Sequence, residues 1–251
     1  MGANELRKAF AELPPLGDLA TPWDRHRRSL RRHVENDNID NFLKWSTIVA
    51  TMFVGEAPYI RSEFDYLMAE NGGWKKAIQE SGVGNPSRLS YADWTSGNLV
   101  HQAYHLKQWQ DHSDLWALEL DEVFEIGPGY GAMAVVLRQA GFQGDFGFHD
   151  LPEFDLLRRF YLDRVGIEVT DIASDSDGIR LTIALFSVDE MPLADRGILK
   201  WNADEYLIAY HPDYGGVDNT KFFKEFTELR PDLSWYDYPW YDYRYLVGVS
   251  G

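Results

Sequence analysis

Three side chains with the chemistry of a general base follow two apolar runs in the second half of the chain. Asp189 and Glu190 come after the run 181–186, and His211 comes directly after the run 205–210. A carboxylate or an imidazole within hydrogen-bond reach of a hydroxyl can take its proton while that oxygen attacks an electrophile. We rank Glu190 first as such a base, Asp189 second and His211 third.

The adjacent pair Asp189-Glu190 has two further interpretations. Two neighbouring carboxylates can raise each other's pKa, and they can bind a hard cation such as Mg²⁺ that in turn binds a diol. Nothing else in the sequence supports a metal ion, so we assign no metal ligands. One of the two acids can equally be a loop residue that caps a helix over residues 193–199.

A glycine loop follows an earlier apolar strand and precedes a helix. The strand ends in an acidic residue, and glycine then takes alternate positions in the run Val123-Phe124-Glu125-Ile126-Gly127-Pro128-Gly129-Tyr130-Gly131. Glycine lets the backbone turn sharply and come close to a ligand without a Cβ in the way. The apolar segment 132–137 then starts a helix, whose N-terminus offers unpaired N–H groups. Such a strand, loop and helix form the ligand-binding corner of an open α/β sheet.

Two classes of cofactor fit this corner, and the acidic residues distinguish them. Gly127, Gly129 and Ala132 satisfy the dinucleotide pattern G-x-G-x-x-A. Glu125 would repel a pyrophosphate, but it suits a ligand that carries an ammonium group. Asp150, at the end of the next strand, can accept ribose hydroxyls in either fold. Because the loop also begins halfway along the chain, we favour the ligand with the ammonium group.

Composition excludes several other classes of function. The 251 residues are 45% hydrophobic and 25% charged, as in a soluble globular protein of one or two domains. The chain has no cysteine, which excludes disulfides and cysteine-based zinc sites. A net charge of −16 argues against nucleic acids and anionic membranes as partners. Residues 1–15 show no signal peptide and the apolar stretch 48–54 cannot span a bilayer, so we expect a cytoplasmic protein.

Five arginines form a local exception to the acidic balance. They all lie within residues 24–33, and they are Arg25, Arg27, Arg28, Arg31 and Arg32. We interpret this run as a solvated helix face that offsets the acidic remainder of the chain. The alternative is a clamp for a phosphorylated substrate or for an acidic partner surface.

The spacing of apolar residues divides the chain into two halves. Residues 1–115 are predicted to be mostly helical. The first predicted helix covers 38–53 and is capped by Asn38 or Asp40. Three more follow, from Pro58 to Asn71, over 75–80, and from a cap at Ser96 or Asn98 to Trp109. From residue 120 onward strands and helices alternate. The expected strands are 122–126, 146–150, 168–170, 181–186, 205–210, 234–238 and 244–249, and the expected helices are 132–140, 155–165 and 221–230.

This order predicts an α/β fold with a Rossmann-like sheet of parallel strands, closed by a C-terminal antiparallel hairpin. Parallel strands of this kind keep their ligands at their carboxyl ends. We therefore expect two regions, a helical lid or substrate region over 1–115 and a cofactor-binding sheet domain over 116–251.

Two other groups of residues have less specific patterns. His101 and His105 lie one helical turn apart, but the sequence offers no acidic partner for a metal site, so we favour packing or lid contacts with the cofactor. The segment 235–245 is dense in Tyr and Trp. We expect it to form the closing hairpin with cross-strand aromatic pairs, and a homodimer interface or a sugar-stacking platform would use the same residue types.

The stretch from Val123 to the C-terminus resembles the class I S-adenosylmethionine (SAM) methyltransferases, and in detail the sugar O-methyltransferase family. Four segments carry this resemblance: Glu125 to Gly131, Asp150-Leu151-Pro152-Glu153, Ser187-Val188-Asp189-Glu190-Met191-Pro192 and Gly216-Val217-Asp218-Asn219.

The resemblance also implies roles for individual residues. Those that would contact the cofactor are Glu125, Gly127, Gly129, Tyr130 and Gly131 at the methionine part, Asp150 at the ribose hydroxyls, Leu151, Asp171 and Ile172 at the adenine, and Ser187 near the reacting methyl group.

The activity that this resemblance implies is SAM-dependent methyl transfer to an oxygen of a small polar molecule, such as a sugar or natural-product hydroxyl. Such a transfer is an in-line displacement, so the protein mainly aligns the nucleophile, methyl group and sulfur. An N-methyltransferase acting on a small molecule is the alternative within the same class. A SAM-binding protein without turnover would need neither Glu190 nor His211, and an NAD(P) oxidoreductase is the third alternative.

Overall fold

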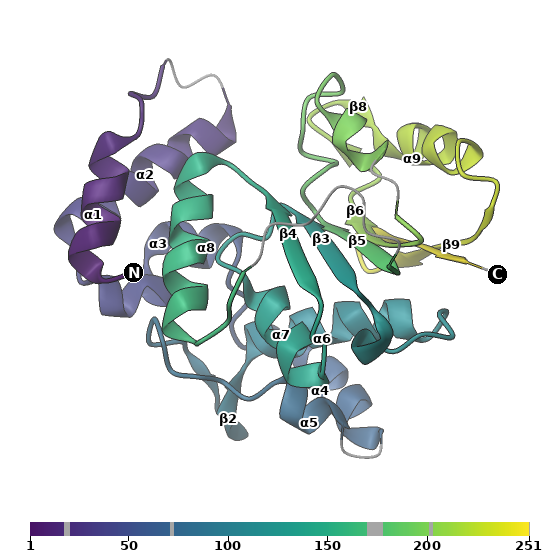
Figure 1. The fold of residues 1–251 in the computed structure, drawn as a ribbon, viewed down its shortest axis with the longest axis horizontal. Coiled ribbons are helices and arrows are strands. Elements are labelled where there is room, and N and C mark those ends of the chain that lie inside the picture. Colours follow the sequence, from purple (N-terminus) through teal and green to yellow (C-terminus); the bar gives the residue numbers. More distant parts are fainter. Residues whose placement is uncertain (18–20, 71–72, 170–177, 201–202, 251) are drawn as a thin grey trace. The chain divides into compact units, whose positions relative to one another are not determined.

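The computed structural model describes residues 1–17, 21–70, 73–169, 178–200 and 203–250 (Figure 1). The described residues form two compact units. The first unit comprises Met1–Tyr104, Gly129–Ala140 and Asp150–Glu168, and the second comprises His105–Pro128, Gly141–His149 and Val169–Gly251. The division of the chain near residue 115 stays a prediction about domains.

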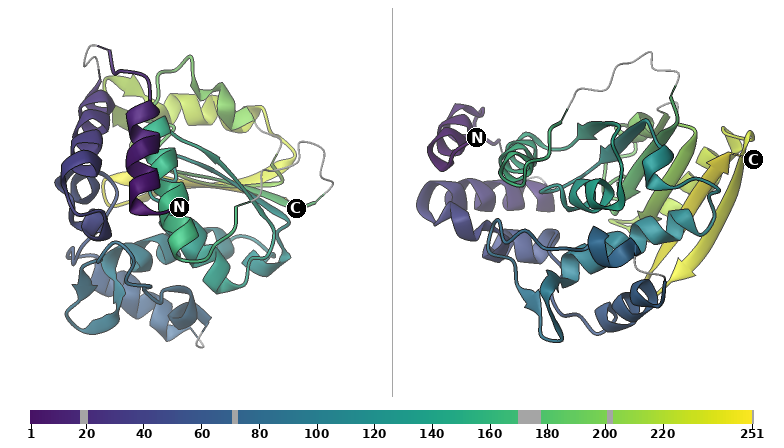
Figure 2. Two further views of the ribbon diagram at one scale, coloured as in Figure 1. Left: turned by 60° about the vertical axis from the view of Figure 1, so that its left-hand side comes forward. Right: turned by 60° about the horizontal axis from the view of Figure 1, so that its bottom comes forward.

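The first unit is mainly helical. It contains α1 (Ala3–Glu12), α2 (Pro22–Asn36), the 3-10 helix η1 (Ile39–Lys44), α3 (Ser46–Thr51), α4 (Ile60–Ala69), α5 (Gly73–Ala77), the first part of α6 (Gly97–Gln110), α7 (Ala132–Ala140) and α8 (Pro152–Arg164). Both α1 and α2 pack against α8, and the left view of Figure 2 shows α1 alongside α8. An antiparallel hairpin of β1 (Arg88–Leu89) and β2 (Ala92–Ser96) lies in a stretch for which the sequence predicted no strand.

The predicted single helix over 38–53 is wrong, because the backbone is extended at Trp45 (φ −64°, ψ 139°). This break separates η1 from α3. The Trp45 ring lies 5.3 Å from the ring of His33 and almost parallel to it, and it also meets the edge of Phe42. These contacts hold Trp45 in place, and helical periodicity in the sequence cannot register them. The predicted cap at Asn38 is confirmed, since its side chain accepts the N–H of Asp40.

Two arginines of the basic run are held in a buried ion pair. Arg27 Nε lies 2.7 Å from Glu153 Oε2 and Arg31 Nε lies 2.8 Å from Glu153 Oε1, while the Glu153 side chain is 0% exposed. Burial alone would raise the pKa of Glu153, but hydrogen bonds from the two guanidinium groups lower it below its ordinary value. The interpretation of the whole run as a solvated face is therefore wrong for Arg27 and Arg31, which fasten α2 to the start of α8.

The second unit is built on a six-stranded sheet with the strand order β4-β3-β5-β6-β10-β9. Its strands are β3 (Glu122–Ile126), β4 (Asp145–His149), β5 (Arg180–Leu185), β6 (Glu205–Tyr210), β9 (Leu233–Trp240) and β10 (Tyr243–Ser250). The four strands β3 to β6 are parallel, and β10 runs antiparallel to both of its neighbours. The right view of Figure 2 shows the long β9–β10 hairpin at one edge of this sheet. The predicted α/β fold, a mostly parallel Rossmann-like sheet with a C-terminal antiparallel pair, is confirmed.

Shorter elements complete this unit. They are η2 (Ala117–Glu119), η3 (Arg196–Lys200), β7 (Asp213–Tyr214), β8 (Val217–Asp218), α9 (Asn219–Glu228) and the last residues of α6. The helix predicted over 193–199 is thus a short 3-10 helix that begins later. The strand predicted over 168–170 is wrong for Glu168 and Val169, which lie in no strand, and its last residue lies outside the described residues.

One face of the sheet forms the apolar core of this unit. Alternate residues of β3, Phe124 and Ile126, point to the same face as Ile208 of β6, and there they join Phe223 and Phe226 of α9 in one buried cluster. In the closing hairpin, Tyr238 and Tyr245 are register partners with ring centroids 5.5 Å apart, so the predicted cross-strand aromatic packing occurs there. None of the helices among the described residues is long and apolar enough to cross a membrane.

Candidate active site

The acid that follows β4 binds the backbone of the glycine loop. Gly129 N–H donates to Asp150 Oδ2 at 3.0 Å, and Leu151 N–H donates to Asp150 Oδ1 at 2.6 Å. Asp150 is half-buried as a residue, and removal of its carboxyl group from water raises its pKa to about 7, although the two N–H groups act in the opposite direction. Each carboxylate oxygen can accept a second hydrogen bond, so the predicted role toward two ribose hydroxyls is compatible with these contacts.

The glycines of the loop are needed within the protein itself. Gly129 has φ +56° and Gly131 has φ +94°, backbone conformations that disfavour other residues. A Cβ on Gly129 would lie 3.0 Å from the sulfur of Met52, and one on Gly131 would lie 3.1 Å from side-chain carbons of Arg158 and Leu162. Packing within the protein therefore already requires glycine at these positions, and the approach of a ligand to them stays a prediction.

Tyr130 points into the core of its unit. The residue is 2% exposed, and its hydroxyl accepts a hydrogen bond of 2.6 Å from Asn98 Nδ2. Its ring meets the edges of Phe42 and Tyr161. Although Tyr130 is predicted to contact the cofactor, its side chain here serves packing, and Leu151 beside Asp150 is the N-cap residue of α8.

In the second unit, the ends of β3 and β5 are tied together around Gly127. Gly127 N–H donates to the carbonyl of His149 at 2.8 Å, and the Ser187 hydroxyl donates to the carbonyl of Ile126 at 2.5 Å. A Cβ on Gly127 would lie 2.4 Å from the Cβ of Ser187, so no larger residue fits. Glu125 is buried in β3, in register with Phe148 and Ile183. Asp171 and Ile172, also predicted to bind the cofactor, lie outside the described residues.

The structure joins Asp189 and His211 into one pair. Asp189 Oδ2 accepts the backbone N–H of His211 at 2.9 Å, and it lies 2.9 Å from His211 Nδ1. Because the carboxylate accepts from Nδ1, the proton of the neutral ring is held on that nitrogen and Nε2 is left as the basic atom. The Asp189 side chain is 0% exposed, whereas His211 is 33% exposed. Asp189 is therefore a positioning residue, and His211 is the member of the pair that can meet a substrate.

The acids around His211 set its pKa. The hydrogen bond to Asp189 raises the pKa of His211 above its ordinary value, burial opposes this shift, and the charge of Glu190 adds to it. Glu190 is half-buried, and it also raises the pKa of the neighbouring Tyr214 in addition to the effect of burial. The ranking of Glu190 before Asp189 and His211 stays a prediction, and the hydrogen bond to Asp189 is the observation in favour of His211.

Two buried residues that the sequence analysis did not select hold this pair in place. Arg196 donates to the carbonyl of Asp189 at 2.7 Å and to Asn219 Oδ1 at 2.7 Å, and Asn219 Nδ2 donates to the carbonyl of His211 at 2.9 Å. Together they bridge the loops after β5 and β6. Asn219 ends one of the four segments that carried the family resemblance, so the sequence did contain a signal for it.

Phe186, directly before Ser187, has the unusual φ of +58° for a residue with a side chain. Its backbone N–H donates to the carbonyl of Ala209 at 2.8 Å, and its ring lies 5.1 Å from that of His211 and 4.8 Å from that of Tyr243. Non-glycine residues in this region cost about 1–3 kcal/mol and cluster at functional sites. Nothing in the local sequence predicts this conformation.

The two histidines of α6 are both engaged in the interior of the protein. His101 Nδ1 lies 2.9 Å from Glu63 Oε2, and both residues are buried in the first unit. His105 Nδ1 lies 2.5 Å from the hydroxyl of Tyr245 in the second unit. The expectation that these histidines serve packing is therefore confirmed, and His101 does have an acidic partner, which lies 38 residues earlier in the chain. Among the residues that the structure describes, no group of three His, Asp or Glu side chains is arranged to hold a metal ion.

No protein-family model and no curated protein sequence matches this chain. Solved structures of similar fold do match it. The magnesium protoporphyrin IX methyltransferase of Synechocystis PCC 6803, with SAM bound, is 12% identical over 90% of this chain and 97% of that chain, with a TM-score of 0.43.

Two further structures have similar scores. A methyltransferase of Podospora anserina with S-adenosylhomocysteine (SAH) bound is 11% identical over 79% of this chain and 91% of that one, with a TM-score of 0.39. An O-methyltransferase family protein of Burkholderia thailandensis is 16% identical over 61% of this chain and 59% of that one, with a TM-score of 0.38. Identities and scores this low leave the chemistry of the chain to be argued from its own residues.

Proposed function

We propose that this protein is a SAM-dependent methyltransferase that acts on a hydroxyl group of a small polar molecule, such as a sugar or a natural product. One observation carries the proposal: the acid that ends β4, Asp150, accepts a hydrogen bond from the glycine loop that follows β3. A carboxylate fixed beside such a loop, with lone pairs to spare, is what a ribose diol requires.

The chemistry of the predicted cofactor residues suits SAM better than a dinucleotide. The strand and loop from Glu125 to Gly131, together with Asp150 and Leu151, contain two carboxylates and no cationic side chain. Carboxylates attract the ammonium group of a methionine moiety and accept hydrogen bonds from ribose, but they repel a pyrophosphate. Gly127, Gly129 and Asp150 are therefore the residues that we assign to SAM first, with Glu125 near the ammonium group.

When bound, SAM supplies a methyl group on a sulfonium, which an oxygen nucleophile can displace. The contribution of the protein is to align that oxygen and to accept its proton. We assign proton acceptance to Nε2 of His211, because Asp189 holds the other ring nitrogen. The partly exposed His211 ring is accessible to an acceptor, whereas the buried Asp189 is not.

The same pair supports an enzyme over a SAM-binding protein without turnover. A fully buried carboxylate costs free energy unless its partners compensate for the lost water. Asp189 Oδ1 has no hydrogen-bond partner among the described residues, and its second oxygen serves only to fix His211. This cost is explained if the buried Asp189 must hold the His211 imidazole in the one tautomer that can act as a base. An amine acceptor would also use this base, so an N-methyltransferase is the second candidate.

Calorimetry on the purified protein with SAM, SAH and NAD tests the cofactor assignment. We expect SAH to bind in the micromolar range, about −7 to −9 kcal/mol, and NAD not to bind. Asp150→Ala should weaken SAH binding by about 1–3 kcal/mol, because a pair of ligand hydroxyls loses its acceptor. Tight NAD binding without SAH binding would refute the proposal. Screening hydroxylated and amine acceptors with radiolabelled SAM would then separate O- from N-methylation.

A further inference from the structure

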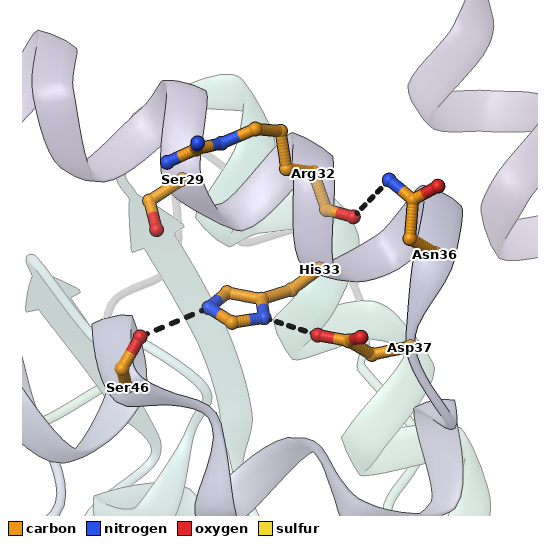
Figure 3. A pocket seen from close by; sticks show the side chains of 6 residues that line it. All are labelled: Ser29, Arg32, His33, Asn36, Asp37 and Ser46. Atoms are coloured by element: carbon orange, nitrogen blue, oxygen red, sulfur yellow. Dashed lines mark hydrogen bonds and ion pairs between the residues drawn. The ribbon is translucent and has the colours of Figure 1, made fainter.

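A second group of reactive side chains lies in the first unit, among residues that the proposed methyl transfer does not use. His33 Nε2 lies 3.1 Å from the hydroxyl oxygen of Ser46, and His33 Nδ1 lies 2.5 Å from Asp37 Oδ2 (Figure 3). The order of contacts is thus carboxylate, imidazole and hydroxyl, with a different ring nitrogen for each partner. This is the arrangement by which a histidine activates a serine as a nucleophile.

These three residues line a pocket of about 300 Å³. Its other lining residues are Ser29, Arg32 and Asn36. Four of the six lie on one face of α2, at the helical spacing 29, 32, 33 and 36. Figure 3 shows Arg32 and Ser29 above the His33 ring and Ser46 on the other side of that ring from Asp37. The pocket therefore offers a nucleophile, a base and one cationic group in the same space.

Packing fixes the histidine in this group. The His33 ring stacks on Trp45, with centroids 5.3 Å apart and 9° between the ring planes. The extended backbone at Trp45 begins α3 at Ser46, so the break that separates η1 from α3 also presents the serine to the histidine. Asp37, which ends α2, is held by a hydrogen bond of 3.0 Å from Arg7 to its carbonyl oxygen. Ser46 itself is exposed and accessible to a substrate.

We propose that Ser46, His33 and Asp37 form a second catalytic site, which hydrolyses a small carboxylic ester that carries a negative charge. Ser46 Oγ attacks the ester carbonyl carbon while its proton passes to His33 Nε2. The bond from that carbon to the alcohol oxygen breaks, and the alcohol leaves with this proton. Water then attacks the acyl group on Ser46, gives a proton to Nε2, and releases the acid as the proton returns to Ser46. Asp37 keeps the other ring nitrogen protonated throughout, and Arg32 pairs with the negative charge of the substrate.

Labelling with a fluorophosphonate probe, followed by peptide mapping of the full chain, tests the nucleophile directly. We expect the label on Ser46 in the natural sequence, and we expect His33→Ala to abolish it. Ser62→Ala is the matched control, since Ser62 is an exposed serine of the same unit whose hydroxyl donates to the carbonyl of Tyr59. This control should be labelled like the natural protein.

Hydrolysis of two model esters tests the reaction and its specificity. 4-Nitrophenyl succinate carries a carboxylate and 4-nitrophenyl acetate does not. Ser46→Ala and His33→Ala should each lower the rate with the succinate ester by about 10²-fold or more. Arg32→Ala should lower kcat/KM for the succinate ester and leave the acetate ester unchanged. If Ser46 is not labelled, or if folded Ser46→Ala hydrolyses both esters like the natural protein, the three residues only fasten the end of α2 to α3 and the proposal is wrong.

Discussion

Two histidine–aspartate pairs in this protein use the same atoms in different surroundings. His211 Nδ1 lies 2.9 Å from Asp189 Oδ2, and His33 Nδ1 lies 2.5 Å from Asp37 Oδ2. The Asp189 side chain is 0% exposed, however, while that of Asp37 is 49% exposed. Water screens the exposed pair, whereas the buried carboxylate interacts with its histidine at a lower effective dielectric constant. The buried Asp189 therefore raises the pKa of His211, and the exposed Asp37 orients the His33 ring through its contact with Nδ1.

The two pairs also differ in how the chain assembles them. His33 lies in the last turn of α2 and Asp37 is the C-cap residue of that helix four positions later, so the end of α2 places them together. Asp189 and His211 are 22 residues apart, and they meet because β5 and β6 are parallel neighbours whose carboxyl ends lie together. Arg196 and Asn219 then lock the two loops. The first pair depends on local structure alone, and the second requires the sheet.

The largest effect is expected for the base of the buried pair. His211→Gln should lower methyl-transfer turnover by about 10²–10⁴-fold, the usual scale for the loss of a general base. SAH affinity should not change, because the imidazole is not assigned to cofactor binding. Turnover can be followed with radiolabelled SAM, and affinity by calorimetry. A folded variant with turnover within tenfold of the natural protein would exclude His211 as the base.

Glu190→Gln is the matched control, because Glu190 is the other partly accessible proton acceptor of the same loop. Its charge raises the pKa of His211, and it is the carboxylate of Asp189 that lies 2.9 Å from Nδ1 of the ring. We expect turnover to fall less than tenfold. If Glu190→Gln is the variant that loses about 10²-fold or more, the order of preference from the sequence was right and the assignment from the geometry is wrong.

A third acid, Asp150, extends the comparison to a carboxyl group whose hydrogen-bond donors are backbone N–H groups, those of Gly129 and Leu151. Burial raises its pKa from the ordinary 3.8 to about 7. Between these values the folded protein keeps a proton that the unfolded chain has lost, so the free energy of unfolding falls as pH rises. The difference in pKa corresponds to a loss of about 4 kcal/mol in the free energy of unfolding, and this loss is complete only above pH 7.

Unfolding in urea at several values between pH 4 and pH 8 measures this contribution. Asp150→Asn cannot titrate, so the free energy of unfolding of the variant should fall less steeply over this range than that of the natural protein. Parallel curves for the two proteins would show that Asp150 has the same pKa in the folded and unfolded states.

Asp189→Asn tests whether the buried acid controls its histidine. Without the carboxylate, the pKa of His211 should return toward its ordinary value, since the hydrogen bond to Asp189 is the largest cause of its increase. The base is active when deprotonated, so the acidic limb of the plot of kcat against pH should move to lower pH. If the acidic limb does not move in a variant that still binds SAH, the limb reports the pKa of a group other than His211.

Local signals explain which parts of the fold and site could be predicted from the sequence. The bounds predicted for β3, α7 and β6 agree with the structure, because each is rich in apolar residues and is followed by glycine or by polar residues. The helix break at Trp45 could not be predicted, because the Trp45 ring stacks on His33, which lies earlier in the chain, and apolar spacing does not reveal such a contact.

The pairing of side chains from distant segments was also missed. Glu153 lies 126 and 122 residues from Arg27 and Arg31, and charge spacing along the chain cannot connect them. Asp189 and His211 were both selected, but as competing bases rather than as partners, since their contact depends on strand order. Sequence patterns thus selected the candidate residues, and the sheet topology determined which of them lie together.

The smallest effect is expected for the exposed pair. Asp37→Asn should change the free energy of unfolding by less than about 1 kcal/mol. The Asp37 carboxylate is half-exposed, so water can replace its contact with His33 at little cost. Asp189→Asn should cost more, about 1–3 kcal/mol, because it disturbs a buried acceptor that serves both a backbone N–H and an imidazole. Urea unfolding of both variants at pH 7 gives the two values. Equal losses would mean that burial of the carboxylate does not distinguish the pairs, and a larger loss for Asp37→Asn would mean that the end of α2 depends on its exposed acid.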